Sequence, residues 1–304
     1  MRLTRTLFLT LSLTLVVACG DSAGSSASAA PLRVVTTTTV LTDFAHVIGG
    51  DRVSVHGVLK PNVDPHDYEP SAKDLDSMRK ARVIVMNGVH LEPWFHDAAS
   101  ASGTKATVVD ASAGIALRAA DDNRESPEGD PHIWHDPRNA KRMVATMLAA
   151  FVAADPAGAQ IYATNAAHYT ADLDALDLDI AAQIGTLQNK KLVTNHDAFG
   201  YYVDRYGLEF VGSIIPSFET SAEVSASELA DLIDEVKTQG VKAIFAEAAL
   251  PAKVAKTIAD EAGVKVVDGE GALYGDGLGP SKSPGGTYLT MMRHNTTTIV
   301  DNLG

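Results

Sequence analysis

The sequence predicts an α/β protein built from two pseudo-symmetric lobes, each with about four parallel strands and flanking helices, joined by one long rigid helix. Three observations support this fold class. From Leu32 onwards, short runs of β-branched residues alternate with helical stretches, as in parallel α/β architecture. One unbroken helical stretch separates about four strands from about four more. A chain of 304 residues is also long enough for two cores of ordinary size.

The N-terminus has the pattern of an export signal. Arg2 and Arg5 precede an apolar run, residues 7–17, that is too short to span a membrane. Residues 16–19, Val-Val-Ala-Cys, resemble a bacterial lipobox, in which the cysteine becomes the lipidated first residue of the mature chain. The alternative is an ordinary leader that is cut later, near Ala30.

We therefore expect a signal peptide at residues 1–18 and a flexible, lipid-anchored tether at 19–31, rich in Gly, Ser and Ala. The protein would face the outside of the cytoplasm, as a cell-membrane lipoprotein or a periplasmic protein. Cys19 is the only cysteine, so neither a disulfide nor a thiolate zinc site is available. The formal charge of −13 argues against nucleic acid and against an anionic membrane surface as partners.

The first lobe is expected at residues 32–154. Its strands are β-branched or apolar runs, and the helices between them have recognisable end signals. Gly49-Gly50 ends one helix, and Ser71, followed three residues later by Asp74, has the pattern of a helix N-cap. We expect strands at 33–39, 53–59, 82–87 and 105–110, and helices at 41–48, from about 71, and at 138–153.

The two lobes are expected to be joined by a linking helix at residues 155–188. Asp155 followed by Pro156 is typical of an N-cap with proline at the first helical position. Only Gly158 weakens the helix after that point, so it would be ~30 residues and ~45 Å long. Its apolar spacing is helical but keeps no strict heptad, which favours a rigid strut over a coiled coil. These apolar residues are Ile161, Leu173, Leu176, Ile180 and Ile184.

The alternation of strands and helices restarts after the linking helix, and we place the second lobe at residues 189–304. Its strands are short and end in turns that carry polar residues, as in the first lobe. This repetition indicates two versions of one architecture. We expect strands at 191–194, 208–215, 241–246 and 264–267, and helices at 198–205, 225–239, 251–262 and 288–302.

Three histidines, His66, His132 and His196, lie singly in rigid turns after apolar runs, and Asp276 follows in a glycine-rich turn. Their long separations do not suit a zinc finger, whose ligands come in close pairs. They suit one ligand from each quarter of a two-lobed molecule. Imidazole nitrogen and carboxylate oxygen are good zinc donors, and four of them complete a tetrahedral site. Manganese, which prefers more oxygen ligands, is the competing metal.

Other residues near these turns are candidates for supporting roles. His135, three residues after His132, is either an orienting group or an alternative ligand. Asp268 and Glu270 lie close to Asp276 and are rivals for the carboxylate position. A carboxylate can also orient a ligand imidazole through its second nitrogen. The candidates for that role are Asp67, Asp197 and Glu247.

Five stretches carry a resemblance to a known family: Asp64-Pro65-His66 with Tyr68-Glu69-Pro70-Ser71, Asn87-Gly88 with Leu91-Glu92, Asp130-Pro131-His132-Ile133-Trp134, Thr194-Asn195-His196-Asp197-Ala198-Phe199-Gly200-Tyr201, and Leu273-Tyr274-Gly275-Asp276-Gly277-Leu278-Gly279. With them the chain resembles, from about Leu32 to its end, the solute-binding proteins of bacterial ABC transporters for zinc and manganese. The resemblance implies two α/β lobes joined by one long helix, with metal in the cleft between them and an ABC permease as partner. It also implies the ligands His66, His132, His196 and Asp276.

Two features differ from common patterns of that family. Many zinc members have a long His-rich loop ahead of the second ligand, whereas residues 118–130 are acidic and contain no His. A solvated surface loop is the simplest interpretation of this stretch, and attraction of cations towards His132 is the alternative. Because this loop has no His with which to pass zinc to the site, delivery of zinc by a periplasmic metallochaperone is a further hypothesis. Manganese members commonly have Glu where His196 stands, which favours zinc here, although members with three His and one Asp are not uniformly zinc-selective.

The first functional hypothesis is a lipid-anchored, monomeric binding protein, not an enzyme, that captures Zn²⁺ and hands it to an ABC permease. A manganese-binding protein of the same type is the alternative. A secreted zinc hydrolase would need an open ligand position and a general base, whereas four protein ligands close the coordination sphere. A surface adhesin that retains the metal site needs no motif and stays open as a third hypothesis.

Overall fold

The computed structural model describes residues 30–119 and 128–304. The expected signal peptide, Cys19 and the tether as far as residue 29 lie outside these ranges, as does most of the acidic stretch at 118–130. Within the two described ranges, none of the helices combines the length and the hydropathy needed to traverse a bilayer. Residues from Pro31 to Gly304 form one compact unit.

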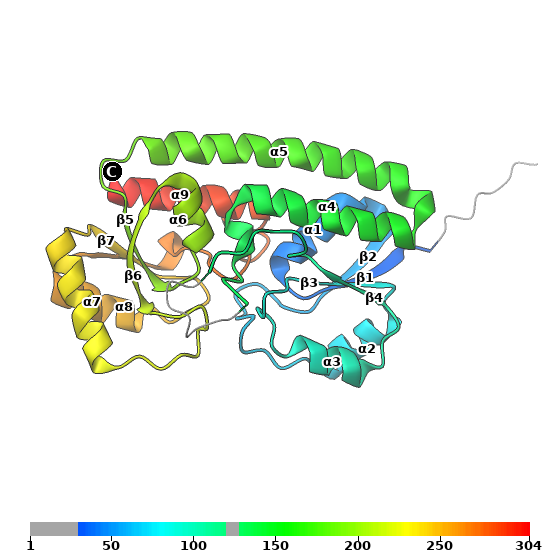
Figure 1. Cartoon of the computed structure of the whole chain (residues 1–304), viewed down its shortest axis with the longest axis horizontal. Helices are drawn as coiled ribbons and strands as arrows, with labels where there is room; N and C mark the ends of the chain where they lie inside the picture. Colours follow the sequence, from blue (N-terminus) through cyan, green and yellow to red (C-terminus); the bar gives the residue numbers. More distant parts are fainter. Residues whose placement is uncertain (1–29, 120–127) are drawn as a thin grey trace, which may run out of the picture. The chain divides into compact units, whose positions relative to one another are not determined.

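The first sheet has four parallel strands in the order β2 (Val53–Gly57), β1 (Leu32–Thr36), β3 (Val83–Met86) and β4 (Thr107–Asp110). The helices on its two faces are α1 (Thr39–Gly49) and α4 (Pro137–Ala154) on one, and α2 (Ala72–Lys80) and α3 (Phe95–Ser102) on the other (Figure 1). Successive side chains of a strand point to opposite faces. Val34 and Val83 accordingly pack in the core with α1 and α4, and Val35 and Ile84 pack in the core with α2 and α3.

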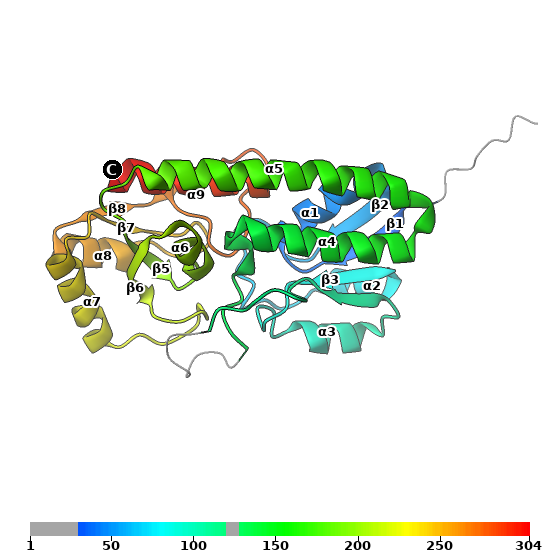
Figure 2. The same cartoon turned by 45° about the horizontal axis from the view of Figure 1, so that its top comes forward.

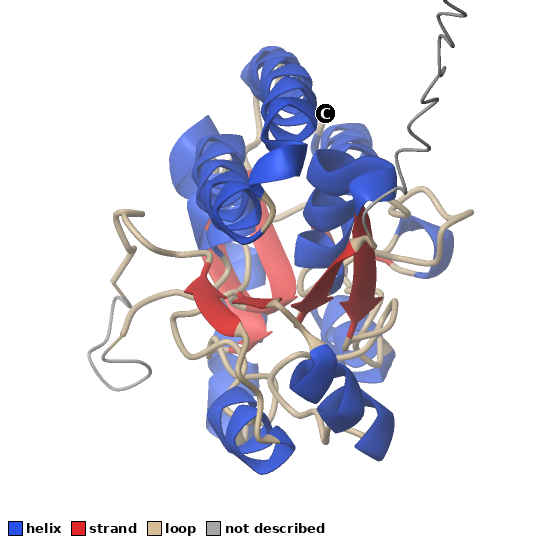
Figure 3. Ribbon diagram, turned by 90° about the vertical axis from the view of Figure 1, so that its right-hand side faces the viewer, coloured by secondary structure: helices blue, strands red, loops and turns tan. Residues whose placement is uncertain are grey.

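The second sheet repeats this arrangement, with parallel strands in the order β6 (Glu209–Ile215), β5 (Lys191–His196), β7 (Ala243–Phe245) and β8 (Lys265–Val267). One face packs with α7 (Ala226–Gln239) and α8 (Lys253–Ala262), and the other with α6 (Gly200–Tyr206) and α9 (Tyr288–Leu303). Seen along the long axis, helices lie above and below the strands (Figure 3). The predicted α/β class with two sheets of four parallel strands is confirmed.

Local end signals explain several boundaries. The hydroxyl of Ser71 accepts a hydrogen bond from the Asp74 backbone N–H, and the Asp74 carboxylate accepts one from the Ser71 N–H, so the predicted cap of α2 is a full capping box. Helix α3 was not expected, because its eight residues are mostly Ala and Ser and bury only Phe95, Ala98 and Ser102. Four 3₁₀ turns complete the described elements: η1 (Gly50–Arg52), η2 (Ile133–His135), η3 (Pro156–Gly158) and η4 (Gly269–Gly271).

Helix α5 (Ala159–Gly185) has 27 residues and passes along both halves of the molecule (Figures 1 and 2). It packs on α1 and α4 beside the first sheet and on α6 and α9 beside the second. Four of the five expected apolar contacts are buried, whereas Ile161 is 45% exposed and Tyr162 takes its place in the core. At 1.5 Å per residue the helix spans about 40 Å.

The predicted start of this helix at Asp155 is wrong by one turn. Pro156 opens the separate turn η3, and α5 begins at Ala159. Asp155 is the N-cap residue of η3, with Pro156 as the first residue of that turn, whereas Gly158 is the N-cap residue of α5. The Asp155 carboxylate accepts hydrogen bonds from Arg52 Nη2 at 2.6 Å and from the Tyr162 hydroxyl at 2.7 Å. The predicted Asp-Pro signal therefore marks the start of the helical region, one turn before α5.

Candidate metal centre

Four buried side chains from four separate loops or strand ends meet between the two sheets. His66 follows β2, His132 immediately precedes η2, His196 is the last residue of β5, and Asp276 follows η4. Each residue offers one ligand atom, and these atoms all lie within 4.8 Å of one another. Parallel α/β sheets place ligands beyond the carboxyl ends of their strands, which is where the fold brings these loops together.

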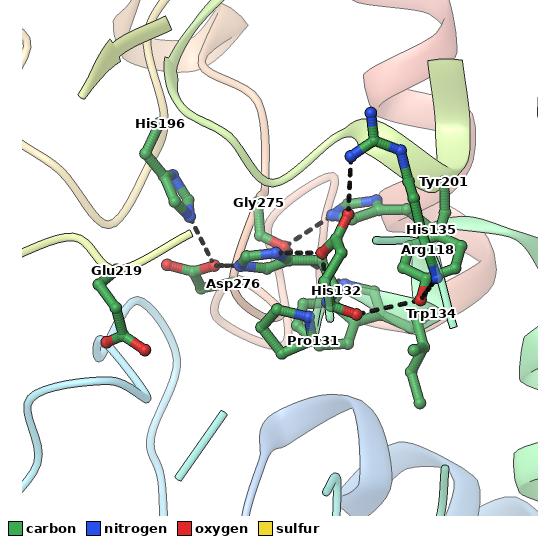
Figure 4. Close-up of polar contacts among 12 residues, drawn as sticks. Arg118, Pro131, His132, Trp134, His135, His196, Tyr201, Glu219, Gly275 and Asp276 are labelled. Carbon is green, nitrogen blue, oxygen red and sulfur yellow. Dashed lines mark hydrogen bonds and ion pairs between the residues drawn. The ribbon is translucent and has the colours of Figure 1, made fainter. Parts of the chain in front are cut away.

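Asp276 lies at the centre of the group. Its Oδ1 is 3.1 Å from Nε2 of His196, 3.3 Å from Nε2 of His132 and 3.9 Å from Nε2 of His66. Figure 4 shows His132 and His196 on either side of this carboxylate. The four residues that the sequence singled out are thus in contact distance of one another.

The unused polar atoms of this group fit a cation. Within the described residues, Nε2 of His66, Nε2 of His132 and Oδ2 of Asp276 are buried without a hydrogen-bond partner. Buried polar atoms without partners cost free energy, so several of them converging on one point need an explanation. Three imidazoles and a carboxylate are a good donor set for Zn²⁺ and would explain the arrangement.

The electrostatics of the group are those of a strongly coupled charge cluster. Burial by itself would lower the pKa of His66, but its contacts with Asp276 and Glu219 raise it to about 9. Against the same burial effect, Asp276 and Glu247 raise the pKa of His196 well above its ordinary value. Burial would raise the pKa of Asp276, but the neighbouring imidazoles hold it well below its usual range. Without metal, the group therefore holds protons.

Three carboxylates contact the second ring nitrogens of the histidines. Asp130 Oδ1 accepts from His132 Nδ1 at 2.9 Å, and Glu247 Oε1 accepts from His196 Nδ1 at 2.9 Å. Glu219 Oε2 lies 3.3 Å from His66 Nδ1, as an ion pair. Such contacts select the tautomer and fix the orientation of a ligand imidazole.

Of these three carboxylates, the sequence singled out only Glu247. A signal for Asp130 was available, because Asp-Pro-His occurs twice. In both copies the aspartate Oδ1 accepts the histidine backbone N–H at 2.9 Å, from Asp64 in the first and Asp130 in the second. Glu219 has no such local signal, since only the tertiary fold places it beside His66.

The other candidates for orienting roles lie differently from expectation. Asp67 is exposed, and within the described residues no hydrogen bond or ion pair links it to a ligand histidine. The Asp197 side chain makes no hydrogen bond to His196, and burial followed by repulsion from Asp130 raises its pKa to about 6. The rival carboxylates also lie elsewhere, since Asp268 pairs with Lys256 at 2.6 Å and Glu270 is exposed.

His135 is fully buried but points away from the four ligand atoms. Its Nε2 donates to the Gly275 carbonyl at 2.9 Å, and its ring lies on Phe199 with 4.6 Å between the centroids. Burial, followed by repulsion from His132, lowers its pKa to about 3, so the ring is neutral. The structure thus places His135 against the backbone next to Asp276 and outside the group of four ligand atoms.

A second cluster of buried hydrogen bonds, between Asn87 and Glu92, supports the loop that carries His132. The buried Glu92 carboxylate accepts the Asn87 N–H at 2.8 Å and the Thr37 hydroxyl at 2.5 Å. This holds Asn87, whose side-chain amide donates to the Pro131 carbonyl at 2.9 Å. Burial raises the pKa of Glu92 to about 7. The Asn87 to Glu92 turn therefore positions the residue directly before His132.

Comparison with known proteins identifies the family. Residues 34–302 match the family described as zinc-uptake complex component A, periplasmic (ZnuA). The chain is 34% identical over 308 residues to the manganese-binding lipoprotein MntA of Bacillus subtilis strain 168, covering 98% of this chain and 97% of that protein. It is 33% identical over 304 residues to the high-affinity zinc uptake system protein ZnuA of the same strain, covering 95% and 94%.

Solved structures show the same likeness. The periplasmic zinc-binding protein TroA from Treponema pallidum superposes with a TM-score of 0.83 at 30% sequence identity, covering 90% of this chain and 99% of that one. The manganese-bound periplasmic metal-binding protein from Candidatus Liberibacter asiaticus superposes with a TM-score of 0.79 at 25% identity, covering 89% and 99%. The chain therefore belongs to the ZnuA family, the metal-binding, substrate-binding components of ABC transporters.

Proposed function

We propose that this protein captures Zn²⁺ through His66, His132, His196 and Asp276 and delivers it to an ABC permease. The observation that carries the proposal is the convergence of four buried ligand atoms within 4.8 Å of one another, three of them imidazole nitrogens. Nitrogen-rich donor sets favour Zn²⁺ over Mn²⁺ by ligand softness and by the Irving–Williams order. Four protein ligands also close a tetrahedral shell and leave no position for a catalytic water, which argues against the hydrolase hypothesis.

We propose that Cys19 carries a lipid anchor, that residues 19–31 act as its tether, and that the monomeric body works outside the cytoplasm. Residues 32–154 and 189–304 would act as the two lobes and 155–188 as their link. A periplasmic metallochaperone would supply the zinc, and retention of the metal by a surface adhesin is the remaining alternative.

Manganese is the competing cargo, because relatives named for manganese and for zinc match this chain about equally well. A competition titration of the metal-free chain from Pro31 against chelators decides between them. We expect tight one-to-one Zn²⁺ binding and much weaker Mn²⁺ binding. Mn²⁺ binding of equal or greater strength would overturn zinc as the cargo, and no tight binding of either metal would overturn the four-ligand site.

Replacing His196 with Glu is expected to shift the preference of the site towards Mn²⁺, because it exchanges a nitrogen donor for an oxygen donor. Glu247 now accepts from both the backbone N–H and Nδ1 of His196, at 3.0 and 2.9 Å, so a new carboxylate at that position would repel it. The substitution should therefore be measured alone and with Glu247→Gln. The exposed His46→Glu is the matched control, and it should leave the ratio of the two dissociation constants unchanged.

Metal removal is expected to loosen the ligand loops while α5 keeps its protection from hydrogen exchange. A continuous helix that packs on both halves resists large hinge bending, so the loops around His66 and residues 269–286 must supply the motion. Hydrogen–deuterium exchange with and without Zn²⁺ measures both regions at once. A large rigid-body closure, seen as a marked fall in the radius of gyration on adding metal, would contradict this expectation.

A further inference from the structure

Arg118 makes polar contacts with both halves of the molecule, next to the carboxylate that contacts His132. Its Nε lies 3.0 Å from Oδ2 of Asp204 on α6, and its Nη1 lies 3.6 Å from Oδ2 of Asp130. The other oxygen of the fully buried Asp130 carboxylate is the one that accepts from His132 Nδ1. A continuous chain of polar contacts therefore runs from Asp204 on α6, through Arg118 and Asp130, to the His132 imidazole.

The backbone strengthens the same connection. The Tyr201 hydroxyl donates to the Asp130 carbonyl at 3.0 Å and accepts the Arg118 N–H at 3.0 Å. The Asp130 N–H donates to the Arg118 carbonyl at 2.8 Å. Arg118 and Asp130 are thereby held side by side, at the base of the acidic stretch, by a residue of α6.

The first residue of α6 leaves room for this contact. A Cβ added at Gly200 would lie 2.5 Å from Nη1 of Arg118 and 2.7 Å from Oδ2 of Asp130, closer than atoms can pack. The absence of a side chain at this position lets the helix come close enough for the guanidinium to reach the carboxylate. Close packing of α6 and the Arg118 contact therefore depend on the same glycine.

We propose that Arg118 is a positioning residue for metal binding, which holds Asp130 in the orientation that fixes the His132 ring and so ties that ligand to α6. The inference rests on the proposed function of the four-ligand site. Within the described residues, Oδ2 of Asp130 makes no hydrogen bond, so the guanidinium is the positive charge that faces this buried oxygen. Without it the carboxylate could turn, and His132 would lose its fixed orientation.

The expected effect follows from the distance of Arg118 from the metal. Partners in direct contact with a ligand typically contribute 10–100-fold to metal affinity. Arg118 acts one contact further out, so we expect Arg118→Met to weaken Zn²⁺ binding about 3–10-fold. Arg118→Lys keeps a positive charge near Asp130 and should recover part of the loss. Gly200→Ala, which favours the helix but crowds the contact, should weaken binding in the same direction.

The matched control is Arg142→Met. Arg142 lines the same surface pocket of about 390 Å³ as Arg118, but it is exposed and has no contact with Asp130 within the described residues. All variants are made in the chain from Pro31, which forms one compact unit. Chelator competition gives the Zn²⁺ affinity, the visible spectrum of the Co²⁺-loaded protein reports the ligand geometry, and thermal unfolding of the metal-free protein reports the fold.

The expected result is weaker Zn²⁺ binding and a shifted Co²⁺ spectrum for Arg118→Met, partial recovery in Arg118→Lys, and wild-type behaviour in Arg142→Met. A wild-type chain that binds Zn²⁺ while Arg118→Met shows the same affinity and the same spectrum would overturn this inference alone. An Arg118→Met variant that loses only thermal stability would also overturn it, because its role would be structural. A wild-type chain that binds neither Zn²⁺ nor Co²⁺ would overturn the proposed function as well.

Discussion

Replacing Asp276 with alanine is expected to weaken Zn²⁺ binding by at least about 100-fold, because a direct ligand should contribute more than the outer partners that are typically worth 10–100-fold. Asp276 is also the only carboxylate among the four ligand atoms and lies within 3.9 Å of all three imidazoles. Its loss would leave Zn²⁺ without a negatively charged ligand in a buried site, where charge is costly to leave unbalanced. Chelator competition measures the change directly.

The control for this substitution is Asp268→Ala. Asp268 lies near Asp276 in the sequence, but its carboxylate pairs with Lys256 and contributes no ligand atom to the group. We expect its removal to leave Zn²⁺ affinity unchanged. If Asp268→Ala abolished binding and Asp276→Ala did not, the carboxylate ligand would have been assigned to the wrong loop.

Zn²⁺ affinity is expected to fall at least about tenfold for each pH unit between about pH 8 and pH 6, because one pKa unit corresponds to a tenfold change in an equilibrium. Burial opposes a proton on His66, but Asp276 and Glu219 raise its pKa to about 9, so it is protonated in the metal-free protein throughout this window. A ligand imidazole must be neutral, so Zn²⁺ has to displace that proton. Further protons from His132 and His196 would make the dependence steeper.

Calorimetry in two buffers with different heats of ionisation counts the protons released per Zn²⁺, and affinity measured across the same window should give the same number. An affinity that did not change with pH would contradict a protonated metal-free site. The raised pKa of His66 also stabilises the metal-free fold. This contribution is fully present below the unfolded value of 6.5 and is lost as the pH rises through about 9.

Local sequence patterns were sufficient to predict the fold class and most of the helices and strands. The β-branched run at β1 and the capping box at Ser71 depend on neighbours within a few residues, so they can be predicted without knowing the fold. The same local reasoning placed the start of α5 one turn too early, because the Asp155-Pro156 pattern opens the 3₁₀ turn η3 instead. Helix α3 was missed because its sequence carries little apolar periodicity.

The amino-acid sequence was sufficient to predict an α/β chain with two repeated halves and to select His66, His132, His196 and Asp276 as one group. Rigid turns at strand ends can be recognised locally, and parallel sheets bring such turns together. Which carboxylates contact the imidazoles, and that Arg118 connects Asp130 to α6, could be seen only in the folded structure. Those contacts join residues far apart in the chain, and their distances depend on how the two halves pack against each other, which no local pattern records.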